Sequence, residues 1–298
     1  MREHFTEHLL LLFLALIWSA SFLLIKIGVG GVGPVTLTAA RMCIAALALG
    51  AYLLARKTGI PLHARALLLY AVVGFLGNTL PFILISWGEL HIDSSLAAIM
   101  MGVMPITTFV LAHFFIPSET VTARRIFGLC LGCGGLLTLV GVSALDGLGA
   151  GVLGQLAVLA GAVSYGVTTV FVRTQPAFPG FQMAAGAIFA GVLASVPLAF
   201  LMEDPSAMRP DAASVGAVVV LGLLPTAFAA LLYFRLIRSL GAMVFSQLNY
   251  VIPIFGSLWG VALLGEVLQL RMVAALSLVL AGIYFVQSAP ARAPEPPG

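Results

Sequence analysis

Charged side chains are scarce in this sequence. Aspartate, glutamate, lysine and arginine make up only 8% of the 298 residues, whereas hydrophobic residues make up 61%. Soluble domains carry about 25% charged residues, so this chain has too little polar surface to cover itself in water. We therefore expect its main partner to be the lipid bilayer. The net charge of +3 is small and dispersed, which argues against nucleic acid as a partner.

Sequence motifs for cofactors, metals and covalent catalysis are also missing. Two of the three cysteines, Cys130 and Cys133, form a C-x-x-C pair, but no strand–helix redox context surrounds them. Packing of small residues within a membrane helix is the favoured interpretation. The glycine-rich stretch at 28–33 follows an apolar span rather than a strand, which argues against nucleotide binding. We expect no cofactor, no metal site and no enzymatic activity.

Long apolar runs, by contrast, are abundant. A membrane helix needs about 20 mostly apolar residues, and ten stretches qualify. They are 9–27, 35–55, 66–87, 95–115, 126–143, 151–172, 183–202, 213–232, 242–264 and 272–287. If the N-terminus lies in the cytoplasm, ten lysines and arginines lie on the inner side and three on the outer side. By the positive-inside rule, we expect a multi-pass protein of a bacterial-type inner (plasma) membrane with both termini cytoplasmic.

An internal repeat divides the chain. Pro105 lies within "MMGVMPITTFV", and Pro253 lies within "YVIPIFG" at a matching place in the second half. Glu119 and Glu266 follow these prolines at nearly equal distances. "WSASFLLIK" in the first span aligns with "YGVTTVFVR" in the sixth at the same offset, near 147. Because each half has five spans, the second half enters from the opposite face, as in the inverted-topology repeats of secondary transporters.

We therefore predict an all-α membrane protein of ten transmembrane helices, built as two five-helix repeats around a central cavity. The repeats are 1–146 and 147–288, and the proline-rich segment 289–298 is expected to be a disordered cytoplasmic tail. Pro105 removes the amide partner of the Met101 carbonyl, and Pro253 does the same to Asn249. Lipid cannot satisfy such carbonyls, so we expect both to border a wettable cavity. A fused duplicate needs no second subunit to complete its cavity, and a monomer is expected.

These residues resemble a known family. The tryptophan of the first span, the mid-helix prolines Pro105 and Pro253, and "LLGE" at 263–266 are similar to the duplicated EamA module of the drug/metabolite transporter superfamily. The resemblance covers nearly the whole chain and is greatest to the YddG-type exporters of aromatic amino acids. It implies a cavity lined by the first, third, fourth, sixth, eighth and ninth spans. The chain departs from the module where Glu119 stands in "PSET" and where Tyr165 matches Trp18.

Polar and aromatic side chains within those spans are the candidates for substrate binding. Asparagine and threonine offer donors and acceptors for a polar head group, methionine is polarizable, and Trp18 and Tyr165 lie too deep for an interfacial belt. Ordinary helix packing is the alternative for each. The substrate-binding candidates are Trp18, Asn78, Thr79, Phe82, Met101, Tyr165, Thr169, Thr226, Ser246, Asn249 and Tyr250, with Pro81, Pro105, Pro225 and Pro253 as helix breaks or hinges.

Arg41 lies inside the second span, where a charge is costly. Because the second span of the superfamily is peripheral to the cavity, a structural role is expected, with the guanidinium on backbone carbonyls or at the outer interface. Acidic residues all lie near span ends or in loops, which argues against proton-coupled export of cations.

The sequence therefore favours uncoupled, facilitated export of amino acids, aromatic and other neutral ones, by alternating access. A broader drug or metabolite exporter, with or without proton coupling, is the alternative within the transporter class. A membrane enzyme acting on lipid would need a catalytic cluster that is not visible, and a non-transporting scaffold leaves the paired helix breaks unexplained.

Overall fold

The computed structural model describes residues 2–116, 122–145, 149–175, 180–245 and 248–287, and every regular element within these ranges is a helix. The first half contains α1 (Arg2–Gly28), α2 (Pro34–Ala55), α3 (Ala64–Gly74), η1 (Phe75–Thr79), α4 (Leu80–Gly88), α5 (Ser94–Met100), η2 (Met101–Val103), α6 (Met104–Phe115) and α7 (Ala123–Leu145). The second half contains α8 (Ala150–Thr174), α9 (Gly180–Met202), α10 (Ala212–Leu221), η3 (Gly222–Phe228), α11 (Ala229–Phe245), α12 (Leu248–Leu264) and α13 (Leu270–Gln287).

Helices occupy all ten ranges in which the sequence predicts a span. Among the described residues, eight continuous helical stretches are long and apolar enough to cross a membrane, and α12 is a shorter apolar helix. The ninth predicted range, 242–264, is divided because α11 continues through Phe245 before α12 begins at Leu248. Large apolar side chains such as Leu54, Leu201 and Leu270 are mostly exposed on the outer surface, where lipid takes the place of water.

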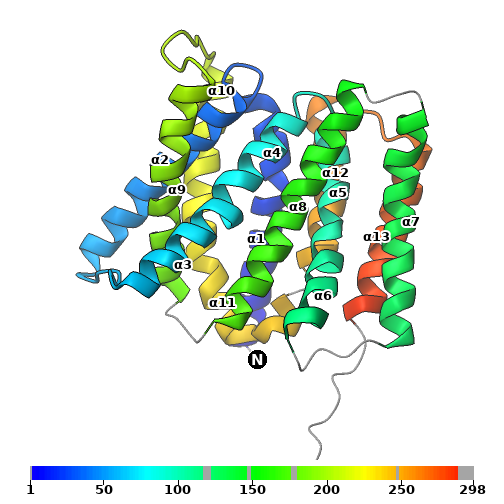
Figure 1. Cartoon of the computed structure of the whole chain (residues 1–298), viewed down its shortest axis with the longest axis horizontal. Helices are drawn as coiled ribbons and strands as arrows, with labels where there is room; N and C mark the ends of the chain where they lie inside the picture. The colour runs from blue at the N-terminus through cyan, green and yellow to red at the C-terminus, as the bar shows by residue number, and fades with distance from the viewer. Residues whose placement is uncertain (1, 117–121, 146–148, 176–179, 246–247, 288–298) are drawn as a thin grey trace, which may run out of the picture.

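The long helices form one bundle, and α7 and α13 form a pair at one edge of it (Figure 1). Glycines let the backbones of this pair approach closely. A Cβ at Gly128 would lie 2.7 Å from the carbonyl oxygen of Gly282, and a Cβ at Gly282 would lie 2.7 Å from that of Gly128. Close contact at small residues is a usual way for membrane helices to associate, so these glycines hold the edge pair together.

Helices from the two halves of the chain interleave throughout the rest of the bundle. Helix α1 packs on α10, α11 and α12, while α8 packs on α4 and α6. Helix α2 packs on α9 and η3, while α9 packs on α3 and η1. The two irregular stretches η1 and η3 are therefore each enclosed by helices of the opposite half.

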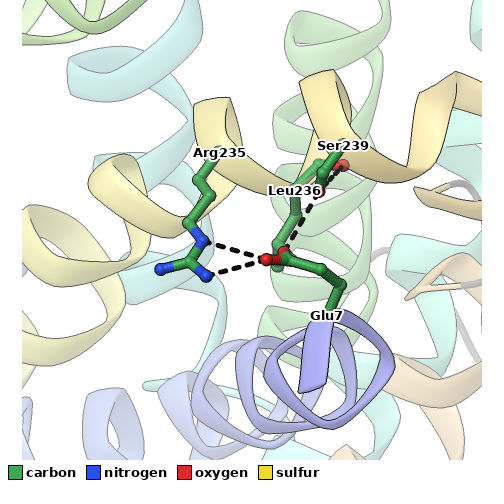
Figure 2. A network of polar contacts seen from close by, with 4 residues as sticks. All are labelled: Glu7, Arg235, Leu236 and Ser239. Carbon is green, nitrogen blue, oxygen red and sulfur yellow. Dashed lines mark hydrogen bonds and ion pairs between the residues drawn. The ribbon is translucent and has the colours of Figure 1, made fainter. Parts of the chain in front are cut away.

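An ion pair joins α1 to α11 near the N-terminal end of the bundle. Figure 2 shows Glu7 reaching from α1 to Arg235 and Ser239 on α11. The Glu7 carboxylate accepts hydrogen bonds from Arg235 Nη2 at 2.7 Å and Nε at 3.2 Å, and from Ser239 Oγ at 3.1 Å. The Arg235 side chain is 58% exposed, so solvent and salt screen this pair.

Replacing Glu7 by glutamine is therefore expected to have a small effect. An exposed pair contributes roughly 0–1 kcal/mol, so the unfolding temperature should fall by no more than about 4 °C. Differential scanning fluorimetry of detergent-solubilised protein measures this change. The matched variant Ser239→Ala keeps the ion pair and should fall less. A much larger fall in Glu7→Gln would mean that this contact holds α1 and α11 together.

Candidate functional site

Two spans are broken by π-helical turns, η1 and η3. A π turn carries one extra residue, which disturbs the regular backbone hydrogen bonds and often marks a functional site. In η1, Asn78 Nδ2 donates to the carbonyl oxygen of Val73 at 3.2 Å. In η3, Thr226 Oγ1 donates to the carbonyl oxygen of Leu221 at 2.7 Å. Both side chains thus reach a carbonyl five residues earlier in the chain.

Pro225 explains why the Leu221 carbonyl lacks its regular helical partner. In a regular helix this carbonyl would accept from the amide of residue 225, but proline has none. Lipid offers no donor, so the adjacent Thr226 hydroxyl satisfies the group. The only hydroxyl hydrogen of Thr226 is used in this bond, which leaves its oxygen lone pairs free to accept.

The first span of each half donates a hydrogen bond to the broken turn of the other half. Trp18 Nε1 donates to the carbonyl oxygen of Pro225 at 3.2 Å, and Ser164 Oγ donates to that of Leu76 at 2.6 Å. The sequence paired Trp18 with Tyr165, but the matching hydrogen bond comes from the neighbouring serine. A serine beside an aromatic residue in an apolar span was the available signal for it.

Arg41 lies at the meeting point of α2, α4 and η3. Its side chain is 2% exposed, and Nη2 and Nε donate to Thr226 Oγ1 at 2.9 and 3.3 Å. Its guanidinium carbon lies 3.8 Å from the centre of the Phe82 ring. Tyr165 on α8 lies close enough to Arg41 for the two to interact electrostatically. Three candidates, Phe82, Tyr165 and Thr226, are therefore gathered around this one cation.

This arrangement corrects the expected environment of Arg41. The sequence placed its guanidinium on backbone carbonyls or at the outer interface, with the second span peripheral to the site. In the structure α2 packs directly on η3, and the guanidinium contacts the Thr226 hydroxyl and the Phe82 ring. The partner lies 185 residues away along the chain, so no local pattern could have indicated it.

An aromatic cluster surrounds Trp18. The Trp18 ring is 6.3 Å from both Tyr233 and Phe245, and the latter two rings are 5.0 Å apart. Sequence analysis identified only Trp18, because Tyr233 and Phe245 fall near the expected boundaries of spans. Trp18 also bonds to Pro225, which adjoins Thr226 in the chain. The cluster and the Arg41 contacts are thus linked through consecutive residues of η3.

The fourth span breaks differently from the sequence expectation. A 3-10 turn, η2, precedes Pro105, and within it the amide of Met104 donates to the Met101 carbonyl. The expectation that Pro105 leaves this carbonyl without a partner is therefore wrong, because the tighter turn supplies one. Pro253 lies inside α12, and a Cβ at Gly102 would lie 3.8 Å from its Cγ. The two proline positions of the repeat consequently lie near each other in space.

The remaining candidates lie in several environments. Thr79 is fully buried and donates to the carbonyl oxygen of Gly191 at 3.3 Å, so it packs against α9. Thr169 bonds to the Tyr165 carbonyl of its own helix at 2.8 Å. Met101, Asn249 and Tyr250 are half-buried. Ser246 lies outside the described residues, as does Glu119.

At the opposite end of the bundle from the N-terminus, two glutamates cap helices of the other half. Glu266 accepts from the amides of Ser94 and Ser95 at 2.8 and 2.9 Å, from Ser94 Oγ at 2.8 Å, and from Ser95 Oγ. Glu203 accepts from the amide of Val35 at 3.1 Å and from the amide of Thr36 at 2.9 Å. Each carboxylate satisfies the free N–H groups at a helix start.

Glu89, at the end of α4, is the third acidic residue of this region. Sequence analysis placed it near a span end, and the structure shows that it is also fully buried. Neither carboxyl oxygen has a hydrogen-bond partner among the described residues. Lys26 Nζ lies nearby, but it donates to the backbone carbonyls of Glu89 at 2.6 Å and Ile92 at 2.8 Å. Its ammonium thus fixes the turn after α4 without bonding the Glu89 carboxyl.

Replacing Thr226 by valine tests the geometry around η3. Valine keeps the shape but removes the hydroxyl that accepts from the Arg41 guanidinium and donates to the Leu221 carbonyl, so we expect a loss of about 1–3 kcal/mol of stability. The unfolding temperature measures the loss of stability, and transport is assayed in the same preparation. Thr169→Val is the matched control, because its hydroxyl bonds only within its own helix. Equal behaviour of the two variants would contradict a special role for Thr226.

Comparison with known proteins matches both halves of the chain to the same family. Residues 5–141 and 152–288 each match the EamA-like transporter family. An uncharacterized transporter, YoaV of Bacillus subtilis, is 23% identical over 90% of this chain and 92% of its own length. A probable terminal-alkyne amino-acid exporter of Streptantibioticus cattleyicolor is 26% identical over 90% and 89%.

Two further similarities extend this picture. An S-adenosylmethionine/S-adenosylhomocysteine transporter of Chlamydia trachomatis is 29% identical over 85% of this chain and 80% of its own length. A solved crystal structure of a protein 21% identical in sequence superposes with a TM-score of 0.63 over 94% of this chain and 96% of that one, which supports the fold alone. Because two family matches together span most of the chain, this protein belongs to the EamA-like transporter family and carries its module twice.

Proposed function

We propose that this protein exports amino acids, aromatic and other neutral ones, across the inner membrane by alternating access. The observation that carries the proposal is the convergence of Phe82, Tyr165 and Thr226 on Arg41, from both halves of the chain, with Trp18 bonded to the carbonyl of the adjacent Pro225. Aromatic rings and a cation suit a ligand with an apolar side chain and a polar head. The alkyne amino-acid exporter among the relatives points to the same class of cargo.

The interleaved packing supports an inverted-topology repeat. Helix α1 packs on the third and fourth spans of the second half, and its counterpart α8 packs on the third and fourth spans of the first. Such reciprocal contacts are expected when two five-span repeats, 1–146 and 147–288, are related by a pseudo-two-fold axis in the membrane plane. We propose ten spans in this arrangement, within a monomer.

Orientation follows from the distribution of basic residues. The start of α1 and the end of α13 lie at the same end of the bundle in Figure 1. The connections at that end carry Arg56, Lys57 and Arg65, whereas Lys26 and Arg209 belong to the opposite end. We propose that the end with more basic residues, and both termini with it, faces the cytoplasm. The expected tail at 289–298 lies outside the described residues.

We propose facilitated export without proton coupling, because no acidic side chain of the described residues lies in the middle of a span. A second candidate is a broader drug or metabolite exporter that is coupled to protons. It is favoured by one observation, the buried Glu89 carboxyl without a hydrogen-bond partner. The S-adenosylmethionine transporter among the relatives also points to a wider range of cargo.

Counterflow in proteoliposomes tests the proposal. Purified protein is reconstituted with unlabelled amino acids inside, and uptake of labelled phenylalanine and leucine is followed. Exchange above that of protein-free liposomes is expected. Absence of exchange for every amino acid tested would refute the proposal. Uphill flux driven by an imposed pH gradient, or competition by cationic dyes, would favour the proton-coupled alternative.

A further inference from the structure

We infer that Arg41 binds the carboxylate of the transported substrate. This inference rests on the proposed function and deepens it, because it names the chemical group that the substrate must carry. It gives the second span a role in substrate binding, whereas the sequence predicted a structural role for Arg41. Four observations lead to it: burial, the lack of an acidic partner, the geometry of the guanidinium, and the apolar surface beside it.

Arg41 is a buried charge without a counterion in the part of the chain that the structure describes. It is 2% exposed, and its hydrogen bonds go only to the neutral Thr226 hydroxyl. A buried cation is costly unless it is paired. An anion brought by the substrate would remove that cost, and a second cation would increase it. The site therefore favours carboxylate ligands over purely cationic ones.

The guanidinium also has N–H groups that the bonds to Thr226 do not use. It has five N–H groups, and the two that bond in this structure, on Nε and Nη2, share the single Thr226 oxygen. The Phe82 ring stacks on one face of the guanidinium, with its centre 3.8 Å from the guanidinium carbon. The in-plane edge is the direction in which arginine binds carboxylates with two parallel hydrogen bonds.

The surroundings indicate what the rest of the ligand looks like. Thr226 adjoins Pro225, whose carbonyl holds the Trp18 indole, and Trp18 packs with Tyr233 and Phe245. A ligand with its carboxylate at Arg41 can therefore rest an apolar or aromatic side chain against this cluster. The inferred substrate class is a small carboxylate with an apolar side chain, of which neutral amino acids are the simplest members.

The test compares ligands that differ only in the carboxylate. Binding of L-phenylalanine, L-phenylalaninamide and 3-phenylpropionate to purified protein is measured from ligand-dependent shifts of the unfolding temperature. Wild-type protein is expected to bind phenylalanine at least about tenfold more tightly than its amide. Arg41→Gln should weaken binding of phenylalanine by about 10–100-fold, because a charge-assisted bidentate contact is lost, and should leave the amide unchanged.

Arg56→Gln is the matched control. It makes the same change just after the last residue of the same helix, and Arg56 likewise lies over a ring, Tyr52, at 5.9 Å, but it is exposed. We expect wild-type binding in this variant. If Arg41→Gln does not fold, Arg41→Lys keeps the charge without the planar fork, and a loss of several-fold in phenylalanine affinity is expected from it.

The outcomes separate this inference from the proposed function. Binding of phenylalanine and its amide with equal affinity, or undiminished phenylalanine binding in the Arg41 variants, would overturn the inference while leaving amino-acid export intact. If no amino acid binds but 3-phenylpropionate binds in an Arg41-dependent way, export of amino acids fails and the carboxylate site stands. If no carboxylate binds at all, both fail.

Discussion

Replacing Glu266 by alanine should lower the unfolding temperature of the purified protein by roughly 10 °C or more. The carboxylate accepts four hydrogen bonds, two from amides and two from hydroxyls of Ser94 and Ser95. Both serines are fully buried, so their donors would be left without partners. At about 1–3 kcal/mol for each unsatisfied group, the total loss is at least about 4 kcal/mol. Differential scanning fluorimetry in detergent measures it.

The pH dependence of the same contact gives an independent check. Burial raises the pKa of Glu266, but the hydrogen bonds from Ser95 and Ser94 outweigh it and hold the pKa below its usual value. A carboxyl with a lowered pKa stabilises the fold above its unfolded pKa, and this stabilisation is lost as the pH falls through the lowered value. Glu266→Gln keeps one acceptor and should lie between wild type and Glu266→Ala. An alanine variant as stable as wild type would contradict this account.

Replacing Glu89 by glutamine should make the protein more resistant to alkaline pH. Burial raises the pKa of Glu89 well above its usual value, Lys26 opposes this and Glu266 adds to it. The folded state therefore keeps a proton that the unfolded chain releases above about pH 4.5. As the pH rises above that value, wild-type stability should fall by about 1.4 kcal/mol per unit until the raised pKa is passed.

The difference between wild type and Glu89→Gln isolates this effect. Lys26 and Glu266 interact electrostatically with the Glu89 carboxyl and are unchanged in the variant, so the difference reports on Glu89 and its coupling to these two groups. Unfolding temperatures measured from pH 5 upward should diverge by roughly 3–5 °C per unit until the raised pKa of Glu89 is passed, with the glutamine variant above. Parallel curves would show that Glu89 is already ionised in the folded protein.

The helices and the repeat could be predicted because each produces a recognisable pattern in the sequence itself. Apolar runs define the spans, and paired prolines with aligned neighbours reveal the duplication. The π turns could not be predicted in this way. One extra residue does not change the hydrophobicity of an apolar run, but it rotates the following side chains about the helix axis by roughly 100°. Thr79, the last residue of η1, donates to the Gly191 carbonyl on α9, a contact that its apolar span does not indicate.

Contacts between the halves were beyond sequence reasoning for a different reason. Arg41 with Thr226, and Trp18 with Pro225, join residues that are 185 and 207 positions apart. Each partner was recognised as a polar or aromatic residue in an apolar span, but nothing in either span specifies the other. Resemblance placed the second span at the periphery, and only its packing on η3 brings Arg41 to the candidate site.

The distance between Arg41 and Thr226 also matters while the protein is being made. Thr226 is synthesised 185 residues after Arg41, and at about 5–20 residues per second this delay lasts roughly 10–40 s. During that time the second span holds a cation whose partner does not yet exist, with only the Phe82 ring of its own half to cover it. Emergence of η3 then supplies the hydroxyl, so this contact between the two halves can form only late in synthesis.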